Sequence, residues 1–158
     1  MNTSHMADRL SAVPLFAGMS KGHVADRLSA VPLFAGLTKK ELSRLSRGTE
    51  IVTVPGDATV VAQDDYGEGV FLLLDGAAKV VRNGRTVARL APGSHFGELA
   101  LLDPGPRTAS VVTTEPSRLA ILGGSKFRVA LRESPRMAER LLASLARRAR
   151  EEGWRDQH

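Results

Sequence analysis

The chain has 158 residues, a formal net charge of +5 and 42% hydrophobic residues, which is an ordinary balance for one globular domain. It has no cysteine, which excludes disulfide scaffolds, thiolate metal sites and cysteine nucleophiles. No apolar run approaches the roughly 20 residues of a membrane span, and no N-terminal stretch has the pattern of a secretory signal. We therefore expect a cytoplasmic protein without a membrane segment.

The N-terminus contains a direct repeat. Residues 7–18 and residues 25–36 both read ADRLSAVPLFAG, so the two copies are identical over 12 positions. Residues 1–6 resemble a leader added by an expression vector. We therefore expect residues 1–24 to be a duplicated or added segment, and the domain to occupy residues 25–158. The spare copy could stay mobile or exchange with another molecule, which would produce a homodimer.

Helices are predicted in residues 25–49, before the main body of the domain. Thr38 followed by Glu41 forms a capping box, which opens a short helix. Seven short β-branched or apolar stretches then alternate with Gly-, Pro-, Asn- and Asp-rich turns. They are residues 50–54, 58–62, 70–74, 77–82, 85–90, 109–113 and 118–122. This spacing is typical of an all-β sandwich or barrel across residues 50–122.

The dipeptide Asn83-Gly84 is the sharpest local signal among these turns. Both residues tolerate the positive φ of a type I′ hairpin. The hairpin would place Val80 opposite Val87 on one face. Plain core packing is the alternative use of this pair.

Helices are predicted again in residues 123–153. Ser134 can cap a helix that has Pro135 at its first position, and a shorter helix at residues 126–132 precedes it. An apolar stripe is expected on the long helix from Leu141, Leu142, Leu145, Ala146 and Ala149. This stripe could pack on the strands or form a homodimer. The whole pattern predicts an α+β fold, an antiparallel β-roll of jelly-roll type flanked by N- and C-terminal helices.

The segment from residue 93 to residue 112 contains the candidate ligand-binding residues. Glycines followed by a short apolar run suggest a helix that starts at Glu98, where free backbone amides favour a phosphate. Arg107 can bind two phosphate oxygens, and Glu98 can accept a hydrogen bond from a ribose hydroxyl. The alternative is that Glu98 and Arg107 only pair with each other beneath a loop.

The residues of this segment resemble the phosphate-binding cassette of cyclic nucleotide-binding domains. The resemblance is carried by Phe96–Leu102 and Pro106–Ala109, and it extends with weaker motifs over about residues 30 to 150. Proteins of this family include bacterial catabolite activators, kinase regulatory subunits and gated channels. The resemblance implies a β-roll at residues 50–122 with its cassette at residues 93–110.

The resemblance also implies a role for each site residue. Glu98 would accept from the ribose 2′-hydroxyl, and Arg107 would pair with the cyclic phosphate. The backbone amides of the cradle would come from Gly97, Leu99, Ala100 and Thr108. Val80 and Val87 would form part of the apolar wall around the base.

The implied ligand is cAMP or cGMP, with cAMP favoured. Thr108 can contact the guanine amino group in cGMP-selective members, but cAMP-preferring members carry Thr or Ser there too. The C-terminal helices would move onto the roll and cover the base, and the candidates for this contact are Arg147, Arg148, Arg150 and Trp154.

Enzymatic and DNA-binding roles are not favoured. The four histidines are scattered without ligand spacing, so we expect no metal, no cofactor and no catalytic residue. The basic excess lies on the predicted C-terminal helices, where a solvated face is expected, and we expect no DNA binding from this chain alone. Two alternatives stay open: an interaction module that needs no ligand, or a fragment of a transcription regulator or other multidomain protein.

Overall fold

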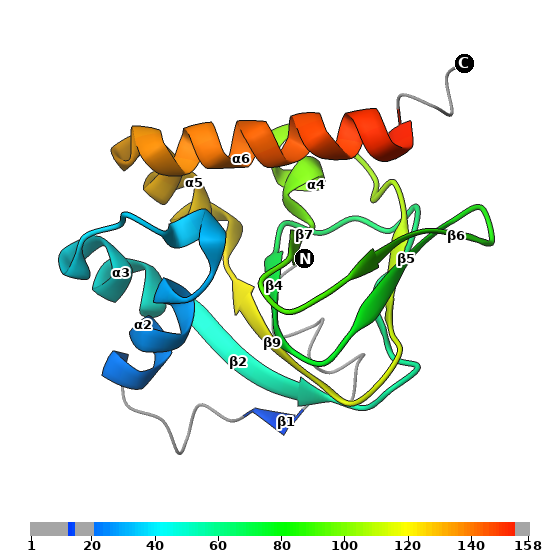
Figure 1. Cartoon of the computed structure of the whole chain (residues 1–158), viewed down its shortest axis with the longest axis horizontal. Helices are drawn as coiled ribbons and strands as arrows, with labels where there is room; N and C mark the ends of the chain where they lie inside the picture. Colours follow the sequence, from blue (N-terminus) through cyan, green and yellow to red (C-terminus); the bar gives the residue numbers. More distant parts are fainter. Residues whose placement is uncertain (1–12, 15–20, 154–158) are drawn as a thin grey trace.

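The computed structural model describes residues 13–14 and 21–153. These residues form an antiparallel β-roll with helices at both ends, so the predicted α+β fold is confirmed (Figure 1). Trp154 and nearly all of the first repeat copy lie outside the described residues.

No helix within the described ranges has both the length and the apolar character needed to span a membrane.

Two sheets build the roll. The first has strand order β1-β2-β9-β4-β7 and the second has β3-β8-β5-β6. The strands are β1 (Val13–Pro14), β2 (Thr49–Val54), β3 (Thr59–Val61), β4 (Val70–Asp75), β5 (Ala78–Arg82), β6 (Arg85–Leu90), β7 (His95–Phe96), β8 (Ser110–Thr113) and β9 (Ser117–Leu122). All seven longer predicted stretches are confirmed as strands, whereas the two-residue strands β1 and β7 were not predicted.

Strand β4 is buried on both faces, which explains its continuous apolar sequence. Because side chains alternate along a strand, Phe71 and Leu73 point into the core inside the roll. Val70, Leu72 and Leu74 point the other way, into a second core beneath the helices. The same strand thus joins the roll to the helical layer.

The N-terminal helical layer consists of α2 (Lys21–Ser29), η2 (Pro32–Phe34) and α3 (Lys39–Ser46). The capping box of α3 is confirmed, because the Thr38 hydroxyl accepts from the Glu41 amide and the Glu41 carboxylate accepts from the Thr38 amide. The second repeat copy contributes Leu28 and Phe34 to the core, and both are fully buried. This copy is therefore an integral part of the domain.

The hairpin of β5 and β6 has the predicted turn but a different register. Asn83 and Gly84 have φ values of 52° and 79°, as a type I′ turn requires. The register then shifts between Val80 and Val81, so Val80 lies opposite Ala88. The predicted pairing of Val80 with Val87 is wrong, because this β-bulge adds a residue to one strand.

The C-terminal layer contains α5 (Gly124–Glu133), α6 (Pro135–Arg148) and the π-helical turn η3 (Ala149–Gly153). Ser134 caps α6 and Pro135 is its first residue, as predicted. Helix α6 runs across the top of the molecule, above α4 (Glu98–Leu102) (Figure 1). The predicted apolar stripe is partly wrong: Leu141 is buried but Leu142 is 66% exposed, because only one of two adjacent helical positions can face the core.

Candidate functional site

Helix α4 begins at a position that only glycine fits. Gly97 precedes the helix with a φ of +91°, in the left-handed region that L side chains rarely adopt. A Cβ atom at Gly97 would lie 2.8 Å from the Gly69 carbonyl oxygen and 2.8 Å from Nη1 of Arg107. The backbone at residue 97 therefore approaches the Arg107 side chain more closely than any other residue type would allow.

Arg107 lies in this narrow space, with its side chain largely buried. Its Nη1 donates to the Gly97 carbonyl at 2.8 Å, and its Nη2 donates to the Gly69 carbonyl at 3.3 Å. The guanidinium carbon lies 5.7 Å from the ring centre of Phe71. Burial lowers the pKa of Arg107, and the nearby charge of Glu98 acts in the opposite direction. The guanidinium is thus held in place by neutral acceptors.

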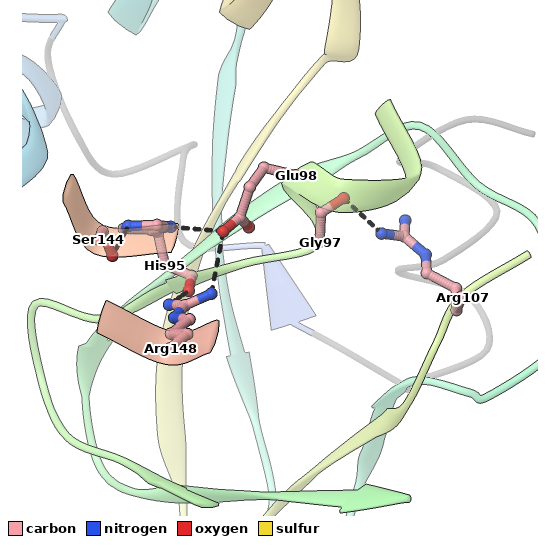
Figure 2. A network of polar contacts seen from close by, with 6 residues as sticks. All are labelled: His95, Gly97, Glu98, Arg107, Ser144 and Arg148. Atoms are coloured by element: carbon pink, nitrogen blue, oxygen red, sulfur yellow. Dashed lines mark hydrogen bonds and ion pairs between the residues drawn. The ribbon is translucent and has the colours of Figure 1, made fainter. Parts of the chain in front are cut away.

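Glu98 is fully buried at the first turn of α4, and its two carboxylate oxygens differ. Oε1 accepts from Nη1 of Arg148 at 2.9 Å and lies 3.0 Å from Nδ1 of His95. Oε2 has no hydrogen-bond partner among the described residues. Figure 2 shows Glu98, His95 and Arg148 gathered on one side of the α4 start, with Arg107 on the other.

The charge state of Glu98 follows from these neighbours. Burial by itself would raise the pKa of Glu98, because a charged carboxylate is poorly solvated in the interior. The hydrogen bond and charge of His95, the charge of Arg148 and a backbone amide outweigh burial, so the pKa of Glu98 is lowered. The site therefore contains a buried, ionised carboxylate.

A polar network connects the cassette to α6. Nε2 of His95 lies 3.0 Å from Oγ of Ser144, and Arg148 donates to the His95 carbonyl as well as to Glu98. Three of the four predicted candidates for the contact over the base lie within the described residues, and of these Arg148 donates to Glu98. His95 and Ser144 were missed, because their partners lie about 50 positions away in the sequence and no local pattern marks them.

A cavity of about 260 Å³ lies between the cassette, the roll and the end of α6. Seven of the eight predicted site residues line it: Val80, Gly97, Glu98, Leu99, Ala100, Arg107 and Thr108. Val87 instead lines the neighbouring cavity between β6 and α6, as does Arg147. From α6 and the turn after it, Leu145, Arg148 and Ala149 also reach the first cavity.

The two charged residues of the cassette do not simply pair with each other. Glu98 contacts His95 and Arg148, whereas Arg107 donates to two backbone carbonyls. This geometry disagrees with the alternative that Glu98 and Arg107 only pair with each other beneath a loop. Both residues line the same cavity.

A family model for the cyclic nucleotide-binding domain matches residues 51–134, which is more than half of the chain. The chain belongs to the cyclic nucleotide-binding domain family. The resemblance expected from the cassette motif is thereby confirmed. The match includes most of the roll, the whole cassette and α5.

Known members of the cyclic nucleotide-binding domain family give the same result. The chain is 37% identical over 102 residues to the cyclic AMP receptor protein of Thermus thermophilus, covering 61% of this chain and 47% of that protein. It is 32% identical over 114 residues to a CRP-like cAMP-activated global transcriptional regulator of Mycobacterium tuberculosis, covering 69% of this chain and 51% of the regulator. The chain therefore spans about half the length of these relatives.

A solved structure of the family shows the same arrangement of elements. The crystal structure of the Thermus thermophilus catabolite activator protein aligns with a TM-score of 0.67 at 36% identity, covering 76% of this chain and 59% of that one. The β-roll with flanking helices is thus the architecture of this family.

Proposed function

We propose that this chain is a sensor domain that binds a cyclic nucleotide, cAMP in preference to cGMP, in the cavity of about 260 Å³. Glu98 accepts from the ribose 2′-hydroxyl and Arg107 binds the cyclic phosphate. Backbone amides around the start of α4 and at Thr108 complete the phosphate cradle, and Val80 forms part of the wall for the base. The role is binding and signalling, with no chemical step on the ligand.

The observation that carries this proposal is the unpartnered Oε2 atom of Glu98. A buried polar atom without a hydrogen bond costs about 1–3 kcal/mol, and more if it is charged. Arg148 donates to Oε1 of this ionised carboxylate and Nδ1 of His95 lies 3.0 Å from the same atom, whereas the buried Oε2 has no hydrogen-bond partner among the described residues. A ribose hydroxyl would supply the missing donor once the ligand reaches this buried oxygen.

Arg107 supports the phosphate end of the same proposal. Its present partners are the neutral carbonyls of Gly97 and Gly69. A phosphate is a stronger acceptor for a guanidinium than a carbonyl is, because the hydrogen bonds become charge-assisted and bidentate. Binding therefore exchanges weak partners of Arg107 for strong ones.

We further propose that the ligand changes the position of α6. Arg148 and Ser144 connect α6 to Glu98 and His95 in the cassette, so a ligand that contacts Glu98 acts on the same network. A ligand shifts such an equilibrium only by its difference in affinity for the two helix positions. Leu145 and Ala149 line the cavity. Contacts of the base with these two residues would supply the difference in affinity between the two helix positions.

Replacement of Arg107 tests the proposal. We expect Arg107→Ala to weaken cAMP binding at least tenfold in calorimetry, because it removes a charge-assisted contact worth roughly 1.5–3 kcal/mol. Arg85→Ala is the matched control, since Arg85 is exposed on β6 and lines neither cavity. A circular dichroism spectrum verifies that both variants fold. Affinity in Arg107→Ala equal to that of the wild type would exclude the proposed phosphate role.

Titration with both cyclic nucleotides tests the choice of base. We expect tighter binding of cAMP than of cGMP, and the relatives from Thermus and Mycobacterium are named for cAMP. Thr108→Ala distinguishes the two ligands further. The variant should bind cAMP within about twofold of the wild-type affinity, whereas cGMP would lose any contact between the Thr108 hydroxyl and its guanine amino group. Absence of binding by either nucleotide would instead favour an interaction module that needs no ligand.

A further inference from the structure

A second cavity, of about 690 Å³, lies between β6 and α6 beside the cassette. Leu90 and Arg148 line both cavities, so they separate the two. Small-molecule sites commonly measure about 300–1,000 Å³. The second cavity is thus large enough for a ligand of its own, and the proposed cyclic nucleotide function does not use it.

Arginines dominate the charge of this second cavity. Four of them line it, Arg89 from β6 and Arg140, Arg147 and Arg148 from α6, against the single acidic residue Glu151. Arg148 is paired with Glu98, so three arginines against one glutamate leave a net charge of +2. The charge of Arg140 is not offset by its hydrogen-bond partner, because that partner is the neutral carbonyl of Pro32. The cavity therefore favours an anion with two negative charges.

Two of these guanidinium groups are available for a ligand. The side chains of Arg89 and Arg147 make no hydrogen bond or ion pair with any residue that the structure describes, and they come from two different elements. Each guanidinium can bind two oxygens of a phosphate at once. A carboxylate supplies only one negative charge, whereas a phosphate monoester supplies nearly two at neutral pH.

We infer that the second cavity binds a small phosphorylated compound, held between Arg89 of β6 and Arg147 of α6. The site is separate from the cassette cavity, because neither arginine lines that cavity. The hydroxyl of Ser94 also lines the second cavity, and its oxygen accepts from the Ala91 amide, which leaves its proton for a ligand oxygen. This inference stands independently of the proposed cyclic nucleotide function.

Calorimetry with inorganic pyrophosphate tests the inference on the full chain, at constant ionic strength set with potassium chloride. We expect saturable binding of one pyrophosphate per chain, weakened at least tenfold in the double variant Arg89→Ala/Arg147→Ala. The double variant Arg85→Ala/Arg132→Ala removes the same charge from exposed positions outside both cavities, and it should bind like the wild type. Arg89→Lys/Arg147→Lys should lie between, because lysine keeps the charge without the bidentate geometry.

Three results would overturn the inference. Equal loss in both alanine double variants would mean that only overall charge attracts the anion. Loss of pyrophosphate binding in Arg107→Ala would place the anion in the cassette. Absence of pyrophosphate binding, together with sedimentation on phosphatidic acid vesicles that depends on Arg89 and Arg147, would assign the arginines to a lipid surface. A failure of cAMP binding alone would leave the inference intact, since that result concerns the other cavity.

Discussion

Gly97 combines two requirements in one residue. Its positive φ excludes most side chains, and its close approach to Gly69 and Arg107 excludes any Cβ atom. Glu98, the next residue, is buried and ionised because His95 and Arg148 compensate for its lost hydration. At the scale of single residues, the cassette thus depends on Gly97 to leave room for Arg107, and on His95 and Arg148 to stabilise the buried charge of Glu98.

Gly97→Ala is expected to destabilise the domain by about 1–3 kcal/mol, which is the usual cost of strained backbone together with a displaced neighbour. It should also weaken cyclic nucleotide binding, because Arg107 must move away from the new Cβ atom. Gly84→Ala is the control, since Gly84 has a φ of +79° but nothing within 4 Å of its Cβ position. Urea unfolding and calorimetry measure the two effects, and equal binding losses in both variants would contradict this account.

Glu98→Gln is expected to change the pH dependence of stability. Because the pKa of Glu98 is lowered in the folded chain from its ordinary value of 4.5, its ionised form stabilises the fold. That contribution is complete above about pH 4.5 and is lost as the pH falls through the lower folded pKa. The difference in unfolding free energy between wild type and variant should therefore shrink as the pH falls below about 4.5. A difference that stays constant down to pH 3 would disprove this role.

At the scale of secondary structure elements, α6 is fixed to the cassette by side chains near its C-terminal end. Ser144 contacts His95 one turn before Arg148 contacts Glu98, so both lie on the same face of the helix. The exposed Leu142 points away from this face. The contact of α6 with the cassette is therefore largely polar near the C-terminal end of the helix. Nearer its N-terminal end, Met137 and Leu141 are buried.

Arg148→Ala is expected to lower the unfolding free energy by about 1–3 kcal/mol, because Glu98 loses a charged donor while it stays buried. Arg147→Ala is the adjacent control: Arg147 is exposed and makes no hydrogen bond or ion pair with a described residue. Its replacement should change stability by less than about 0.5 kcal/mol. Urea unfolding of both variants measures the difference, and equal stabilities would show that the contact of Arg148 with Glu98 does not stabilise the domain.

At the scale of the whole molecule, two hydrophobic cores share the strands β2, β4 and β9. One core fills the roll and the other lies beneath the helices, and alternate residues of each strand serve one or the other. The cavity at the cassette lies between the roll and α6. A ligand in this cavity would contact both the roll and α6.

Ligand binding is therefore expected to raise the thermal stability of the whole domain. At a cAMP concentration 100 times the dissociation constant, mass action stabilises the folded state by about 2.7 kcal/mol. At roughly 2–4 °C for each kcal/mol, the melting temperature should rise by about 5–10 °C. Differential scanning calorimetry measures the shift, and Arg107→Ala should reduce it strongly. An equal shift in that variant would place the ligand away from Arg107.

The sequence alone was sufficient for features that depend on residues a few positions apart. The capping box at Thr38, the turn at Asn83-Gly84 and the start of α6 at Pro135 are confirmed, because each depends on local backbone geometry and one nearby side chain. The cassette motif also identified the family, since its two stretches lie close together in the sequence. Short β-branched or apolar stretches between turn residues predicted the strands for the same local reason.

Only the tertiary structure decided which side chains meet across long sequence separations. The partners of Glu98 include Arg148, 50 positions away, and the pairing of His95 with Ser144 spans 49 positions. The bulge that places Val80 opposite Ala88 lies in β5, which pairs with both β6 and β8, and no local pattern in the sequence marks it. The sequence thus specified the chemical groups of the site and its turn. The tertiary structure decided that Glu98 is buried beside His95 and Arg148, which together lower its pKa, and that its Oε2 has no hydrogen-bond partner among the described residues.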